Sequence, residues 1–240
     1  MGKRMKKYLF LLPIRIVLFI LSFLLISLFT QKGLSEISNL WSIIVSFCNI
    51  VTIMILLCIC KKEKLKYLEL INYKKRNTRT WTVIFVSILT LSIGFFGMYL
   101  AGFICYNIFP YMPVMMLQPI PIMLSIINIF ILPITTTIAE DGLYLGIGVN
   151  QIKNKYTAVL FPAFFYALQH SFIPFLLDSK FIMYRFISFF PLTIIFCIYY
   201  YRKRNPLPIM IGHFIINVAT VFQILIMSMF PALYESIKSM

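Results

Sequence analysis

The chain has 240 residues, of which 61% are hydrophobic and only 12% charged, and it carries a net charge of +15. Soluble proteins of this size contain about 25% charged and roughly 45–50% apolar residues, so this composition excludes a water-soluble fold. The positive charge does not indicate nucleic-acid binding, because the basic residues stand in short clusters between apolar runs and form no basic face on a soluble domain.

Seven apolar stretches are long enough to cross a bilayer as helices, which takes about 20 residues each. They cover residues 8–30, 39–60, 81–109, 119–138, 156–176, 181–201 and 206–231. The segment from Gln118 to Gln151 is longer than one span needs, and Pro133 with the threonines at 135–137 predicts a break in it. A second helical piece there would raise the count to eight. The sequence therefore predicts an all-α, polytopic integral membrane protein with seven or eight transmembrane helices in a single domain, residues 1–240.

Basic residues are distributed unequally between the two sides of this predicted bundle. With the N-terminus in the cytoplasm, seventeen Lys and Arg fall on the cytoplasmic side, within 3–7, 61–79, 153–155 and 202–204. Only Lys32, Lys180 and Lys238 fall on the other side. Cytoplasmic loops carry the excess of Lys and Arg, so we expect a multi-pass protein with a cytoplasmic N-terminus and a 61–80 loop lying on anionic lipid. The first apolar run is too long for a signal peptide and no cleavage site follows it, so it is predicted to stay as a span.

Few ionisable side chains lie inside the apolar segments. Such groups cost roughly 2.5–3.5 kcal/mol each on insertion scales, so each needs a partner or a function. The acids are Glu140 and Asp141, the only two histidines of the chain are His170 and His213, and two arginines lie within or at the edge of spans, at positions 15 and 185. We expect one acid and both histidines to converge from three helices on a polar pocket.

The residue types in this pocket predict hydrolysis of an amide bond. Asn217 follows His213 by four residues and shares its helix face. A carboxylate can take a proton from water, while imidazole and carboxamide groups hold the oxyanion of a tetrahedral intermediate. The same Glu, two His and Asn are also possible zinc ligands, and the residues alone leave this open.

Three motifs on separate predicted spans resemble those of the CPBP family of intramembrane peptidases. This family includes the type II CAAX prenyl endopeptidases and the bacteriocin-processing or self-immunity proteins. Its pattern is Glu-Glu-x-x-x-Arg, then Phe-x-x-x-His, then His-x-x-x-Asn or Asp. The corresponding segments here are Glu140-Asp141-Gly142-Leu143-Tyr144-Leu145, Tyr166-Ala167-Leu168-Gln169-His170 and His213-Phe214-Ile215-Ile216-Asn217. The resemblance extends over a peptidase-like core at residues 118–231.

The resemblance implies a catalytic site made by Glu140, His170, His213 and Asn217, with no cofactor. Glu140 would be the general base that activates water, assisted by His170, while His213 and Asn217 would stabilise the oxyanion. The implied partners are the lipid bilayer and a peptide or membrane-protein substrate. A compact bacterial member, in the plasma membrane, is expected to act in bacteriocin or signal-peptide processing or in self-immunity, and the Ile-, Lys- and Phe-rich composition is typical of an AT-rich bacterial genome.

Three residues depart from the family pattern. Asp141 is shorter than the family's second Glu, Leu145 replaces the motif arginine, and Tyr166 replaces Phe. Arg185 is one candidate to replace the missing cation in space. These departures motivate one alternative, a binding or immunity scaffold that has kept the fold and lost the chemistry. A second alternative is a small transporter in which Glu140 and the histidines relay protons. Gly142 and Gly146 form a small-xxx-small pair that is expected to draw another helix against the Glu140 segment.

Overall fold

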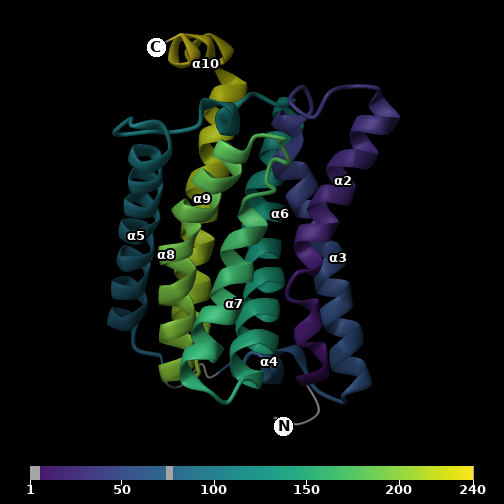
Figure 1. Ribbon diagram of the computed structural model, residues 1–240, viewed down its shortest axis with the longest axis vertical. Coiled ribbons are helices and arrows are strands. Elements are labelled where there is room, and N and C mark those ends of the chain that lie inside the picture. The colour runs from purple at the N-terminus through teal and green to yellow at the C-terminus, as the bar shows by residue number, and fades with distance from the viewer. Residues whose placement is uncertain (1–5, 74–77, 240) are drawn as a thin grey trace.

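The structure, a computed structural model, describes residues 6–73 and 78–239, and every regular element in these residues is a helix (Figure 1). The long helices run side by side along the long axis of the molecule. They are α2 (Ile14–Thr30), α3 (Trp41–Lys62), α5 (Thr80–Tyr106), α6 (Ile122–Glu140), α7 (Lys155–His170), α8 (Ser179–Lys203) and α9 (Leu207–Met229). The short ones are η1 (Lys6–Leu11), η2 (Ser38–Leu40), α4 (Tyr67–Leu70), η4 (Val114–Leu117), the π-helix η5 (Asp141–Val149) and α10 (Pro231–Lys238).

The predicted class, an all-α polytopic membrane protein, is confirmed. Within the described residues, 6 helical segments are long and apolar enough to cross a membrane: Lys6–Thr30, Ser38–Lys62, Thr80–Tyr106, Ile122–Val149, Ser179–Lys203 and Leu207–Met229. Large apolar side chains such as Leu25, Phe85 and Phe130 lie exposed on the outer helix faces, as a lipid environment allows. The predicted span 156–176 corresponds to α7, which has only 16 residues, so its role as a seventh span stays a prediction.

The predicted break around Pro133 is wrong. Helix α6 runs without interruption from Ile122 to Glu140, and the π-helix η5 continues it directly to Val149. The hydroxyl of Thr135 donates to the carbonyl of Ile131 and that of Thr137 to the carbonyl of Pro133. The carbonyl that loses its backbone donor at Pro133 is that of Ile129, which neither hydroxyl contacts, so the helix passes through this position without that bond. The predicted second helical piece is therefore η5, the continuation of α6, rather than a separate eighth helix.

The helices pack in a bundle in which α6 and α7 lie near the middle. Helix α6 contacts α3 and α9, α7 contacts α8 and more sparingly α2, and α5 contacts α8 and α9. At the α5–α8 crossing, a Cβ atom added to Gly97 would lie 2.2 Å from the backbone oxygen of Ser188. The missing side chain at Gly97 thus sets how closely these two helices approach.

The connection between α3 and α5 is more than a solvated loop. Leu70 and Ile71 are buried, and the hydroxyl of Tyr67 donates to the carbonyl of Ile138 at 2.7 Å. Added Cβ atoms on Gly142 and Gly146 would meet Tyr67 and Leu70, respectively. The glycine pair therefore admits the α4 segment against η5, in addition to the end of α3.

The two ends of the bundle differ in charge. The N-terminal end, α4, the connection from η5 to α7 and the end of α8 lie together at the bottom of Figure 1, and they carry most of the described basic residues. Lys32, Lys180 and Lys238 lie on segments at the opposite end, where the C-terminus is found. Of the predicted cytoplasmic set, Lys3, Arg4, Lys74, Lys75 and Arg76 lie outside the described residues. The cytoplasmic position of the basic end stays a prediction.

Candidate active site

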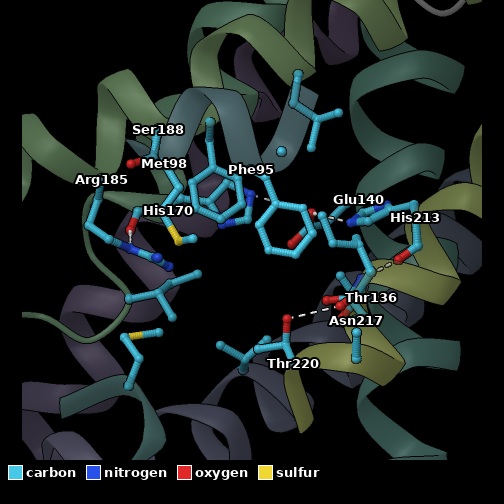
Figure 2. Close-up of a pocket in the computed structure, with 18 of the residues that line it drawn as sticks. Phe95, Met98, Thr136, Glu140, His170, Arg185, Ser188, His213, Asn217 and Thr220 are labelled. Carbon is cyan, nitrogen blue, oxygen red and sulfur yellow. Dashed lines mark hydrogen bonds and ion pairs between the residues drawn. The ribbon is translucent and has the colours of Figure 1, made fainter. Parts of the chain in front are cut away.

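A cavity of about 200 Å³ lies inside the bundle and brings the four predicted site residues together. Glu140, His170, His213 and Asn217 all line it (Figure 2). The rest of the wall is mostly apolar and comes from α3, α5, α6, α8, α9 and the η4 segment, through residues such as Val45, Met98, Leu132, Phe189 and Met116. The cavity therefore joins one polar corner to a largely hydrophobic space.

Glu140 is the last residue of α6, at the junction where the α-helix widens into the π-helix η5. Short π-helical segments occur often at functional sites. The side chain is only 1% exposed, and its two oxygens have different surroundings. Oε1 accepts a hydrogen bond from Arg15 at 2.9 Å, whereas Oε2 has no hydrogen-bond partner among the described residues. Oε2 lies 3.8 Å from Nε2 of His170 and 3.7 Å from Nε2 of His213.

Arg15, on α2, supplies the cation that the family motif would carry at position 145. Its guanidinium is fully buried and pairs with the carboxylate of Glu140. Three of the four other N–H donors are used by polar side chains, since the guanidinium also bonds to Asn49 at 2.8 Å, to Thr52 at 3.1 Å and to Gln169. Leu145 itself is buried in the apolar core. The suggestion that Arg185 takes this place is wrong, because Arg185 forms no ion pair with Glu140.

The other two departures from the family pattern contact each other. The hydroxyl of Tyr166 donates to Oδ1 of Asp141 at 2.9 Å and lies 3.2 Å from Nδ1 of His213. The same Asp141 oxygen is 3.5 Å from that ring nitrogen. The longer side chain at position 166 thus reaches the shorter acid at position 141. As a result, the His213 ring lies between two carboxylates, with Nε2 toward Glu140 and Nδ1 toward Asp141.

His170 and Asn217 are each held by a neighbour. The His170 ring stacks on Phe189 with a centroid separation of 3.7 Å, and the His170 carbonyl accepts a hydrogen bond from Nε of Arg185 at 3.2 Å. The amide nitrogen of Asn217 donates to the backbone oxygen of His213 at 2.9 Å. An amide group carries two N–H donors, so the second one remains for a ligand in the cavity.

The sequence predicted the four site residues that line the cavity, but it did not predict the side chains that fix their positions. Arg15 was recognisable as an arginine inside a predicted span, and an intramembrane charge should be assigned a partner. Nothing in the spacing indicates that the partner would be Glu140, 125 positions away. The role of Tyr166 was hidden for a different reason, because at this position the motif predicts an apolar ring.

The described residues contain no group of three or more His, Cys, Asp or Glu side chains that could hold a metal ion. The zinc site left open by the residue types is therefore not supported by their arrangement. Glu140 instead uses one oxygen for the ion pair with Arg15.

Comparison with known proteins identifies one related family. Residues 122–219 match the family described as type II CAAX prenyl endopeptidase Rce1-like. No curated protein and no solved structure matches the chain. The matched segment begins with α6, ends within α9 and contains Glu140, His170, His213 and Asn217. The match supports membrane localisation and a CAAX-type intramembrane protease kind of function. Over residues 122–219 the chain is thus similar to Rce1-like type II CAAX prenyl endopeptidases, and the CPBP resemblance predicted from the three motifs is confirmed.

Proposed function

We propose that this protein is a glutamate-dependent intramembrane peptidase that hydrolyses a peptide bond in a membrane-associated peptide or protein. One observation carries the proposal. The buried oxygen Oε2 of Glu140 has no hydrogen-bond partner among the described residues, yet it faces two imidazole nitrogens in a cavity. A buried carboxylate oxygen without a partner is costly unless a ligand or water uses it.

The spacing of these groups suits a water molecule. Separations of 3.7 and 3.8 Å from Glu140 to the two imidazoles exceed direct hydrogen-bond lengths. One water oxygen placed about 2.8 Å from each of two such groups would join them. In the proposed reaction Glu140 accepts a proton from this water, with His170 fixing its orientation, while the water oxygen attacks the scissile carbonyl carbon. Glu140 later returns the proton to the leaving amine.

His213 and Asn217 are proposed to stabilise the oxyanion formed in this step. Asn217 has an amide N–H beyond the one bonded to the His213 carbonyl. A protonated His213 ring donates from both nitrogens, and the carboxylates on its two sides would balance its charge. Donors already directed at the developing negative charge are among the largest contributions to such reactions.

The proposed substrate is a peptide that reaches the cavity from the membrane. Most of the cavity wall is apolar, and it includes Phe95, Met98 and Phe189, so hydrophobic side chains would bind there. We propose bacteriocin or signal-peptide processing, or self-immunity, in a bacterial plasma membrane as the biological setting. This assignment follows the family resemblance rather than the site itself.

The proposal is tested with Glu140→Gln in purified protein reconstituted into liposomes. Wild type is incubated with a mixed library of hydrophobic peptides, and products are identified by mass spectrometry. The expected result is cleavage by wild type and a loss of at least about 10²–10⁴-fold in the variant, as for removal of a general base. The matched control is Glu235→Gln, an exposed acid on α10, which should cleave normally. Equal cleavage by Glu140→Gln and wild type would refute the glutamate mechanism, and a biological phenotype that survives this variant would favour the scaffold alternative.

A further inference from the structure

Arg185 is a buried cation that the proposed reaction does not use. The side chain lies on α8, is only 8% exposed and lines the cavity. It forms no ion pair with any described residue. Its one hydrogen bond among these residues runs from Nε to the carbonyl of His170. By contrast Arg15, the other arginine buried within residues 6–73 and 78–239, has a carboxylate partner.

The guanidinium of Arg185 is held in a fixed orientation with its terminal nitrogens unused. The Nε bond to His170 fixes one edge, and the guanidinium carbon lies 4.8 Å from the centroid of the Phe189 ring. Neither terminal nitrogen has a hydrogen-bond partner among the described residues. Figure 2 shows Arg185 at one side of the cavity, with Glu140 and His213 toward the other side and His170 between them. A ligand in the cavity would therefore lie between the cation and the Glu140 carboxylate.

A carboxylate is the group that best satisfies this arrangement. The guanidinium presents two parallel N–H donors that match the two oxygens of a carboxylate. The surrounding wall is largely apolar, which strengthens a charge pair once the ligand has displaced water. An unpaired charge in the hydrocarbon region is otherwise costly, so an anionic ligand would remove a penalty that the protein carries alone.

We propose that Arg185 forms an anion-binding subsite that takes a carboxylate of the peptide substrate. Two sources of this group have the same chemistry, the C-terminal carboxylate of a short peptide and the side chain of an Asp or Glu. The subsite rests on the proposed peptidase function for its biological meaning, but its binding chemistry can be measured without cleavage. Arg185 would then select which peptides are held across the cavity from Glu140.

Binding of three fluorescent probes tests this proposal. They are N-dansyl-Ala-Phe-Leu with a free carboxylate, the same peptide as its C-terminal amide, and N-dansyl-Ala-Asp-Leu amide. Affinities are measured by fluorescence titration of purified protein in nanodiscs, in the Glu140→Gln background so that no probe is consumed. We expect at least one carboxylate probe to bind about 10- to 100-fold more tightly than the uncharged amide, as hydrogen bonds to a charged group predict. Preference for the first or third probe identifies the source of the carboxylate.

Variants of Arg185 decide whether this residue causes the preference. Arg185→Gln should abolish the preference for a carboxylate probe over the uncharged amide, and Arg185→Lys should retain part of it. The matched control is Lys180→Gln, which removes an exposed cation from the same helix, and it should keep the full preference. Equal binding of all three probes by the protein that retains Arg185, or a preference that survives Arg185→Gln, would overturn the proposal. Cleavage is scored separately, so a carboxylate preference without cleavage would refute the peptidase and keep the subsite.

Discussion

Replacing Arg15 with Met should destabilise the bundle and disturb Glu140 at the same time. The variant removes the ion pair with Glu140 and the hydrogen bonds to Asn49, Thr52 and Gln169. Each interhelical hydrogen bond in a membrane protein contributes about 0.6 kcal/mol. Removing one partner of a buried ion pair costs about 3–5 kcal/mol, because the other charge is left uncompensated. The ion pair should therefore dominate the loss in free energy of unfolding.

A double-mutant cycle separates the ion pair from the other contacts of Arg15. The free energy of unfolding is measured by denaturant titration in mixed micelles for wild type, Arg15→Met, Glu140→Gln and the double variant. Each single variant leaves one buried charge without its partner, whereas the double variant contains neither of the two charges. We expect the double variant to be more stable than the sum of the single effects predicts, by about 3 kcal/mol, the upper end for residues in contact.

The control cycle uses an arginine with a different partner. Arg204 donates to Asn150, so Arg204→Met and Glu140→Gln should be additive within about 0.5 kcal/mol. If the effects of Arg15→Met and Glu140→Gln on the free energy of unfolding are also additive within about 0.5 kcal/mol, the argument that Arg15 neutralises Glu140 is refuted. In activity measurements, Arg15→Lys should recover part of the turnover rate lost in Arg15→Met, because it returns a positive charge to this position.

Two further predictions concern single contacts. Tyr166→Phe removes the hydroxyl that donates to Asp141. It should lower the free energy of unfolding, measured by denaturant titration, by about 1.5–3 kcal/mol, the range for a hydrogen bond to a charged group. Adding Asp141→Glu gives both positions the family residues and should recover part of this loss. Gly97→Ala places a Cβ 2.2 Å from the backbone oxygen of Ser188 and should destabilise by about 1–3 kcal/mol through overpacking. Its control, Gly94→Ala, meets only the terminal carbon of Ile216, and an equal loss in both variants would argue against the close α5–α8 contact.

The general architecture was predictable because each apolar span and each charged loop can be recognised from its own consecutive residues. Six of the predicted stretches correspond to helices long and apolar enough to span a membrane. The error at Pro133 has a local cause too, since a proline inside a helix removes one backbone hydrogen bond and is therefore usually taken to predict a break. Here the threonine hydroxyls of α6 bond to backbone carbonyls of the preceding turn. The threonines were therefore counted as signs of a break, although in the structure they accompany an unbroken helix.

The candidate site was predictable only in part. The residues within the motifs could be predicted from the sequence, whereas the residues that contact them from distant parts of the chain could not. Glu140, His170, His213 and Asn217 belong to motifs within one stretch of chain, so order and spacing are enough to group them. The partner of Glu140 is a matter of tertiary packing, because α2 must lie close to α6 and α7 for Arg15 to reach it. Because Leu145 stands where the family motif has an arginine, the motif alone predicts a site that lacks this positive charge. Only the packing of α2 shows that Arg15 pairs with Glu140.

This packing bears on which part of the chain makes up the site. The family match covers residues 122–219 and contains the four residues proposed to act in catalysis. Within this segment, however, no described Lys or Arg pairs with Glu140, and the guanidinium partner comes from Arg15 on α2. Helix α3 adds Asn49 and Thr52, which fix the guanidinium. The matched helices alone would leave the buried Glu140 carboxylate without the permanent positive charge of Arg15, a situation that protonation or local unfolding would relieve. The first two spans therefore belong to the candidate active site as much as the segment that carries its motifs.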